Sequence, residues 1–134
     1  MAGSRSASYP DRRTQRNLAG AVLITICAVT SAAESVEVPK ALWGTWDLGP
    51  DPCSLPLEPD LDSPKWIDAS SIRGYEKNEI PTRVRRVSVA PAVWVIRTDN
   101  DVAPQIVTND IYVLKGDHLT ITDGEFTKHY RRCR

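Results

Sequence analysis

Residues 41–53 read ALWGTWDLGPDPC, and this stretch decides the fold because it combines two tryptophans around a glycine, a proline-flanked turn and a cysteine. Residues 41–48 predict a β-strand with one face made by Leu42, Gly44, Trp46 and Leu48. Glycine weakens the interior of a strand, so Gly44 indicates a bend or a close approach by another side chain. We expect the remaining chain to form strands that close back onto this one and end at Cys133.

The first 33 residues have the parts of a secretory signal peptide. Four arginines and one aspartate precede an apolar run at residues 18–29, and Ser31 and Ala33 supply small residues at the −3 and −1 positions. Spanning a bilayer takes about 20 apolar residues, more than this run offers. We therefore expect cleavage after Ala33 and no stable membrane anchor afterwards. Sec and twin-arginine export both stay open.

The predicted mature chain, residues 34–134, is expected to form a single domain. It has 13 basic and 16 acidic residues, a net charge of −3. A general binder of nucleic acid or anionic membranes would need a basic excess. Loss of Cys27 leaves Cys53 and Cys133, and an even pair in an oxidising compartment predicts a disulfide, with two free thiols as the alternative. We expect a periplasmic or secreted monomer.

Short strand patterns separated by turn signals fill the mature chain. Residues 49–64 contain five prolines, which predicts a long loop pinned at Cys53. Further strands are predicted at residues 71–77, 82–89, 93–96, 106–115, 119–121 and 126–132, with a helical turn after Pro64 as an alternative near the first. This pattern predicts an all-β domain of about seven or eight strands, either a small antiparallel up-and-down barrel or a sandwich.

Three strand details carry specific expectations. The alternation in residues 82–89 slips around Arg85 and Arg86, which indicates a bulge. The continuous apolar run at residues 93–96 predicts a strand buried on both faces. In residues 106–115, Asp110 shares a face with the apolar side chains of Tyr112 and Leu114.

Gly44-Thr45-Trp46, together with arginines on the last strand, resembles the G-x-W signature of lipocalins and related calycin barrels. The resemblance implies that Trp46 packs at the barrel floor and that Arg132, or alternatively Arg131, lies across its ring. Such a contact contributes about 0.5–2 kcal/mol. The wider pattern of W-G-x-W, a proline-flanked cysteine and a terminal Y-x-R-C is similar to small secreted proteobacterial proteins that have no assigned activity.

The geometry of a closed meander constrains the disulfide. With an even number of strands, the last strand runs antiparallel to the first, so Cys133 lies near the start of the first strand, whereas Cys53 follows its end. A disulfide then requires the loop at residues 49–64 to fold back along the barrel, or an odd number of strands. We predict the fold-back.

The sequence does not supply a catalytic or metal-binding constellation. His118 and His129 lack companion ligands at metal-site spacing, and residues 99–101 lack the glycine and distal glutamate of a calcium loop. No serine of the mature chain lies in a G-x-S-x-G elbow. We expect no enzymatic activity, no metal and no cofactor.

Two non-catalytic function classes remain. The first is a cell-envelope binding module, which holds a small apolar ligand in the barrel or presents the loop at residues 49–64 to a protein partner, as inhibitors do. The second is a structural or stress-related envelope protein without a ligand. A candidate surface for an anionic ligand or an acidic partner consists of Arg83, Arg85, Arg86 and Arg97. The alternative for these arginines is cross-strand pairing with Glu76, Glu79, Asp99 or Asp101.

Overall fold

The computed structural model describes residues 34–57 and 61–134. The predicted signal peptide and its cleavage site, at residues 1–33, lie outside the described residues. Within the two described segments, no helix has the length and apolar character needed to cross a membrane.

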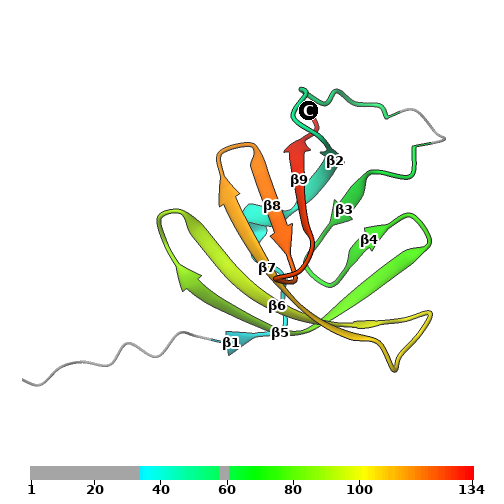
Figure 1. The fold of residues 1–134 in the computed structure, drawn as a ribbon, viewed down its shortest axis with the longest axis vertical. Helices are drawn as coiled ribbons and strands as arrows, with labels where there is room; N and C mark the ends of the chain where they lie inside the picture. Colours follow the sequence, from blue (N-terminus) through cyan, green and yellow to red (C-terminus); the bar gives the residue numbers. More distant parts are fainter. Residues whose placement is uncertain (1–33, 58–60) are drawn as a thin grey trace, which may run out of the picture.

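Eight antiparallel strands close into a barrel (Figure 1). In chain order they are β2 (Gly44–Leu48), β3 (Lys65–Ile67), β4 (Ile72–Gly74), β5 (Lys77–Ser88), β6 (Ala92–Asn100), β7 (Val107–Lys115), β8 (His118–Thr122) and β9 (Thr127–Arg132). Each strand pairs with its neighbours in the chain, and β9 pairs with β2 to complete the circle. The short β1 (Glu34–Ser35) pairs with β5 from outside. The predicted all-β barrel is confirmed, and the sandwich alternative is not observed.

The region around β3 and β4 differs from its prediction. One strand is predicted over residues 71–77, whereas β4 ends at Gly74, the chain turns at residues 75–76 and β5 begins at Lys77. After Pro64 the structure forms β3 in place of the alternative helical turn. The carboxylate of Asp68 accepts hydrogen bonds from the backbone N–H groups of Ser70 and Ser71, at 2.9 and 2.8 Å. These bonds stabilise the turn that connects β3 to β4. Strands this short have too few positions for alternation to show in the sequence.

The two long strands β5 and β6 bear out one detail and correct another. Their pairing shifts register between Arg86 and Ser88, at the bulge expected near Arg86, and also between Pro81 and Arg83. In β6, Trp94 and Ile96 are buried while their neighbour Val95 is only half-buried. The prediction of burial on both faces is wrong because one face of a barrel strand points to solvent.

The buried core is covered at one end of the barrel by the segment before β2. A 3₁₀ turn, η1 (Lys40–Leu42), buries Leu42 against the core, and Val38 is buried beside it. The backbone N–H of Val38 donates to the carbonyl of Ala69 at 2.9 Å, and the Trp43 indole donates to the carbonyl of Val38 at 2.8 Å. These bonds hold the covering segment in place, so this end of the barrel is closed.

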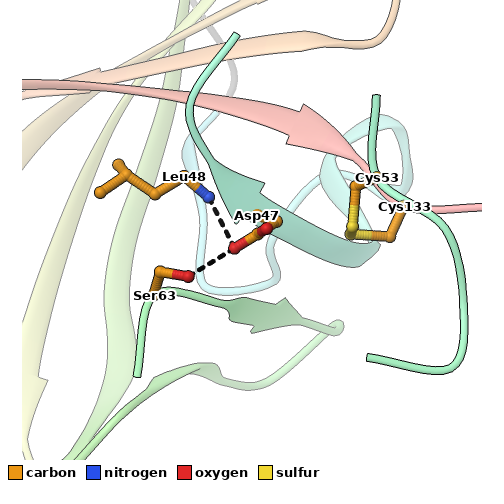
Figure 2. The surroundings of a disulfide bond; sticks show 5 residues. All are labelled: Asp47, Leu48, Cys53, Ser63 and Cys133. Carbon is orange, nitrogen blue, oxygen red and sulfur yellow. Dashed lines mark hydrogen bonds between the residues drawn. A yellow bond between two sulfur atoms is a disulfide. The ribbon is translucent and has the colours of Figure 1, made fainter. Parts of the chain in front are cut away.

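After β2 the chain turns and runs back along β9 to a disulfide. Cys53 and Cys133 are bonded, with their Cα atoms 4.4 Å apart (Figure 2). The N–H of Arg134 donates to the carbonyl of Cys53 at 3.2 Å, and the N–H of Leu55 donates to the carbonyl of Arg134 at 2.9 Å. This local pairing is parallel to β9 and therefore opposite to β2. The predicted disulfide and the predicted fold-back are both confirmed.

The loop then returns to the open end of the barrel before β3 begins. There, the Asp47 carboxylate accepts hydrogen bonds from the Ser63 hydroxyl at 2.6 Å and from the Leu48 N–H at 2.9 Å (Figure 2). The loop is thus tied to the body at both barrel ends, once covalently and once by a hydrogen bond. A disulfide is compatible with an extracellular or periplasmic location.

Candidate functional site

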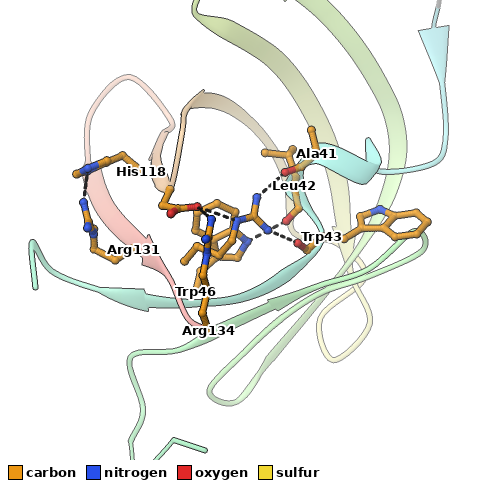
Figure 3. Close-up of polar contacts among 9 residues, drawn as sticks. Ala41, Leu42, Trp43, Trp46, His118, Arg131 and Arg134 are labelled. Carbon is orange, nitrogen blue, oxygen red and sulfur yellow. Dashed lines mark hydrogen bonds and ion pairs between the residues drawn. The ribbon is translucent and has the colours of Figure 1, made fainter. Parts of the chain in front are cut away.

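An arginine stacked on a tryptophan seals the closed end of the barrel. The guanidinium carbon of Arg132 lies 4.1 Å from the centroid of the Trp46 ring. The same guanidinium donates to the backbone carbonyls of Trp43, at 2.5 Å, and Ala41, at 2.7 Å. The Trp46 indole donates in turn to the carbonyl of Leu42 at 2.8 Å. Figure 3 shows this network, which joins the last strand to η1 and to β2.

Of the two arginines considered for this position, Arg132 covers Trp46. Arg131 lies away from the indole and contacts the imidazole of His118 (Figure 3). Gly44 has a φ of +129°, and a Cβ there would lie 3.1 Å from Nη1 of Arg132. A side chain at this position would be strained and would crowd the guanidinium, so the close approach expected at this glycine is present.

We expect Arg132→Lys to lower the free energy of unfolding by about 1–2 kcal/mol. Lysine keeps the positive charge but loses the planar fork that stacks on the ring while bonding two carbonyls. The matched control is Arg131→Lys, because Arg131 is the neighbouring arginine and does not cover Trp46; its effect should stay within about 0.5 kcal/mol. Urea unfolding followed by tryptophan fluorescence measures both. Equal losses in the two variants would contradict the assigned packing role.

Four arginines are proposed as an anion-binding surface, and three of them lie on the outer side of β5 and β6. Arg86 instead shares the inward face with its register partner Trp94, so the four do not form one cluster. Arg83 and Arg97 are direct register partners, and Nε of Arg83 lies 3.6 Å from a carboxylate oxygen of Glu34 on β1. The guanidinium of Arg86 lies 5.5 Å from the centroid of the Trp94 ring. Arg85 is exposed. Among the described residues, none of the four makes the cross-strand ion pair considered for it.

The open end of the barrel, where β2 ends and β9 begins, holds a cavity of about 510 Å³. Its wall carries seven charged side chains, which are Asp62, Lys65, Lys77, Glu79, Asp110, Asp123 and Lys128. Apolar contact surface comes from Leu48, Tyr75, Ile121, Phe126 and Tyr130. The cavity is therefore amphipathic, and it faces away from the sealed floor.

A buried carboxylate held by two lysines forms one side of this cavity. Glu79 is 2% exposed. Its two oxygens lie 3.3 Å from Nζ of Lys65 and 2.7 Å from Nζ of Lys77. Burial on its own would raise the pKa of Glu79, but the two ammonium groups outweigh it and hold that pKa below its usual value. Glu79 is consequently ionised at neutral pH, and the charges of both lysines are engaged by it.

A second carboxylate, Asp110 on β7, has no such partner. Within the described segments, no side chain forms a hydrogen bond or ion pair with Asp110. Burial, followed by the negative charge of Glu79, raises the pKa of Asp110. Two residues further along the same face, Tyr112 is fully buried, and its hydroxyl has no hydrogen-bond partner among the described residues. Asp110 lines the cavity, and an unpaired polar group in a cavity wall is a place where a ligand can bind. Tyr112 belongs to the buried core and is not among the lining residues.

The charges of Glu79 and Asp110 also affect the pKa values of two nearby tyrosines. Burial raises the pKa of Tyr130 to about 12, and the charges of Glu79 and Asp110 add to the effect. The same three causes raise the pKa of Tyr112 well above its usual value. The two hydroxyls and the two carboxylates are therefore electrostatically coupled, and both tyrosines stay protonated at neutral pH.

The cavity residues were only partly accessible from sequence. Asp110 is recognisable because it shares a strand face with Tyr112, an acidic residue on an apolar face. Glu79 was missed as a cavity residue, although it precedes Pro81 and Val84 on the inward face of β5. Its partners are Lys77, at the start of β5, and Lys65, on β3. Because β3 has only three residues, its sequence shows no alternation that would place Lys65 inward.

Within residues 34–57 and 61–134, no three histidine, cysteine, aspartate or glutamate side chains gather as a potential metal site. Comparison of the chain with protein-family models, curated proteins and solved structures finds no match. The resemblance to lipocalin-type barrels stays a prediction that rests on Gly44, Trp46 and Arg132. The two barrel ends are therefore the features of the molecule that bear on its function.

Proposed function

We propose that the protein is a non-catalytic binding module of the periplasm or secreted fraction that holds one small molecule in the open mouth of its barrel. The observation that carries this proposal is the difference between the two ends. One end is filled and covered by η1 and Arg132, whereas the other keeps a cavity of about 510 Å³. Small-molecule sites in proteins are typically about 300–1,000 Å³ and often lie in the mouths of β-barrels.

The wall of the cavity favours an amphipathic ligand over the purely apolar one expected from sequence. An apolar molecule would displace water from Asp110 and Lys128 without replacing their hydrogen bonds, which costs free energy. A ligand with a polar head and an apolar body would satisfy the base and also cover the exposed rings and side chains at the rim. Phe126 is the most exposed of these, at 67%.

A second candidate function is presentation of the loop at residues 49–64 to a protein partner. The loop is tied down at Cys53 and Ser63, and it exposes the apolar side chains of Leu55 and Leu61. Exposed leucines in a loop that is anchored at Cys53 and at Ser63 suit a protein interface. A structural or stress-related envelope protein without a ligand is the remaining alternative.

Filling the cavity by mutation separates these functions. Gly74 lines the mouth, and a Cβ there meets nothing closer than the carbonyl oxygen of Pro64 at 4.0 Å. We expect Gly74→Phe to occupy the cavity and to reduce ligand affinity at least about ten-fold, since it removes the space that the ligand needs. Arg73→Phe is the control, because Arg73 is exposed and points to the other face of the same strand.

The measurement is native mass spectrometry of each protein recovered from a bacterial periplasm. Extra mass on the wild type and on Arg73→Phe, but not on Gly74→Phe, would support the cavity as the site. A bare wild-type protein would argue for the structural alternative. A co-purified protein retained by Gly74→Phe and lost when Leu55 and Leu61 are changed to serine would support the loop as a partner surface instead.

A further inference from the structure

Strand β5 leaves part of one backbone edge open. It pairs with β6 along its length from residue 79 onwards, but β4, on its other side, pairs with residues 77–79 alone. The one further pairing on that side among the described residues is with β1, at residues 84–85 (Figure 1). Pro81 lies between these two pairings, and a proline, which lacks a backbone N–H, occurs in sheets at such edges. In the described part of the chain, residues 86–88 have no partner strand on this side.

The short strand β1 shows what this edge accepts. It runs antiparallel to β5 with Glu34 opposite Arg85, and the carboxylate of Glu34 lies 3.6 Å from Nε of Arg83. The side chains of this ion pair are 51% and 62% exposed, so the pair contributes little to stability. β1 has only two residues, and both are exposed. A longer acidic strand can therefore take its place.

The outer face beside this edge carries an excess of positive charge. Arg83 and Arg85 lie on β5, and Arg97 on β6 is the register partner of Arg83. Like charges directly opposite each other in a sheet are destabilising. A hollow of about 300 Å³ is lined by this pair, and Asp99 is the one acidic residue in its wall. Once Glu34 is displaced, three guanidinium groups share one carboxylate, which leaves both charge and space for acidic side chains.

We propose that the β5 edge at residues 82–88 binds an extended acidic segment of a partner protein, which displaces β1 and adds to the sheet as an antiparallel strand. In such a complex, backbone hydrogen bonds provide affinity and alternate side chains provide specificity. This interaction surface is separate from the cavity and does not depend on the proposed function.

The register of β1 specifies the sequence of the partner segment. Successive side chains of a strand point to opposite faces, so two acidic residues must be two positions apart to share the outer face. If one acid lies opposite Arg85, as Glu34 does, the acid two positions later lies opposite Arg83. The residue two positions earlier then lies beside the exposed side chain of Val87. The expected motif is apolar-x-acidic-x-acidic.

The probe is the peptide acetyl-TVTETET-amide, which carries this motif. One control, acetyl-TVTQTQT-amide, lacks the charges, and the other, acetyl-TVTTEET-amide, has the same composition but places its glutamates on opposite faces of a strand. Each is titrated into the oxidised protein recovered from a bacterial periplasm and followed by backbone NMR shifts and hydrogen exchange. We expect the first peptide to bind at least about ten-fold more tightly than either control and to slow amide exchange at residues 82–88.

Three variants of the protein complete the test. Arg83→Gln combined with Arg85→Gln changes two exposed side chains and should weaken binding of the first peptide at least about ten-fold. Arg73→Gln, at an exposed arginine of β4, and Gly74→Phe, which fills the cavity, should bind it within about two-fold of the wild type. Equal binding of the two glutamate peptides without slower exchange would reduce the contact to general charge attraction and overturn the proposal. Absence of binding, or its loss in Gly74→Phe, would overturn it as well, and neither result bears on ligand binding in the cavity of the wild type.

Discussion

Replacing Cys53 and Cys133 together by alanine is expected to lower the free energy of unfolding by about 4 kcal/mol. The disulfide joins residues separated by 80 positions, so it closes most of the described chain into one loop. In the chain-entropy account, a loop of this length restricts the unfolded state by about 4–5 kcal/mol. Small domains have a total stability of about 5–15 kcal/mol, so the loss would be a large fraction of it.

The control for this prediction uses reduction instead of mutation. Urea unfolding of the wild type with and without a reducing agent should give the same difference as the double variant, while the double variant itself should not respond to the reducing agent. Alanine is preferred to serine because Cys133 is buried, and a buried hydroxyl would add its own cost. A difference below about 1 kcal/mol would show that the loop is closed by its other contacts and not by the disulfide.

Loss of the disulfide should also loosen the wall of the cavity. Ser63 donates a hydrogen bond to Asp47 at the mouth of the cavity, and Cys53 anchors the same loop through the disulfide. We expect the hydrogen bond to weaken when the disulfide no longer restrains the loop. Hydrogen exchange in the double variant is expected to rise in the loop at residues 49–64 more than in the long strands β5 and β6. We therefore expect covalent closure to support the wall of the cavity as well as the stability of the domain.

The disulfide path was predictable because it follows from topology. An even number of antiparallel strands fixes the direction of the last one, and this direction places Cys133 opposite the start of β2, regardless of side-chain detail. Trp46 and Arg132 were identified by resemblance, and the close approach at Gly44 by the weakness of glycine in strands. These features depend on local sequence motifs or on whether the number of strands is even, and both can be determined from a sequence.

The cavity at the open end of the barrel was not predictable in the same way. Whether a barrel is filled depends on the sizes of side chains that meet from eight strands, and no single segment contains that information. The network of Glu79 with Lys65 and Lys77 illustrates the difficulty, since charged residues in a short strand are indistinguishable from surface residues until their partners are known. Likewise, the sequence suggested several acidic partners for the arginines on β5 and β6, but Glu34 was not among them. Arg83 approaches Glu34 because β1, a strand of only two residues, pairs with β5.

Glu79→Gln is expected to lower the free energy of unfolding at pH 7 by about 3 kcal/mol. Removing one member of a buried ion pair leaves the other uncompensated, and the Lys65 side chain is only 15% exposed. The expected value lies at the lower end of the usual range of about 3–5 kcal/mol because the change also relieves the repulsion between Glu79 and Asp110. The control is Glu76→Gln, in the exposed turn before β5, which should change stability by less than about 0.5 kcal/mol.

The pH dependence of this loss tests its electrostatic origin. The folded-state pKa of Glu79 lies below the ordinary value of 4.5, so its ionised form contributes stability that is fully present above pH 4.5 and disappears as the pH falls through the folded-state pKa. Asp110 titrates in the opposite sense in both proteins, and Glu79→Gln removes only the part of its pKa shift that the Glu79 charge causes. The difference in stability between wild type and variant therefore reports chiefly on Glu79. That difference should be constant from pH 7 to about 5.5 and should shrink below pH 4.5, where protonated glutamate comes to resemble glutamine. Urea unfolding at a series of pH values measures it. A difference that stays at its neutral value down to pH 3 would mean that Glu79 supports the barrel by packing alone, and that Lys65 and Lys77 are free to serve an anionic ligand.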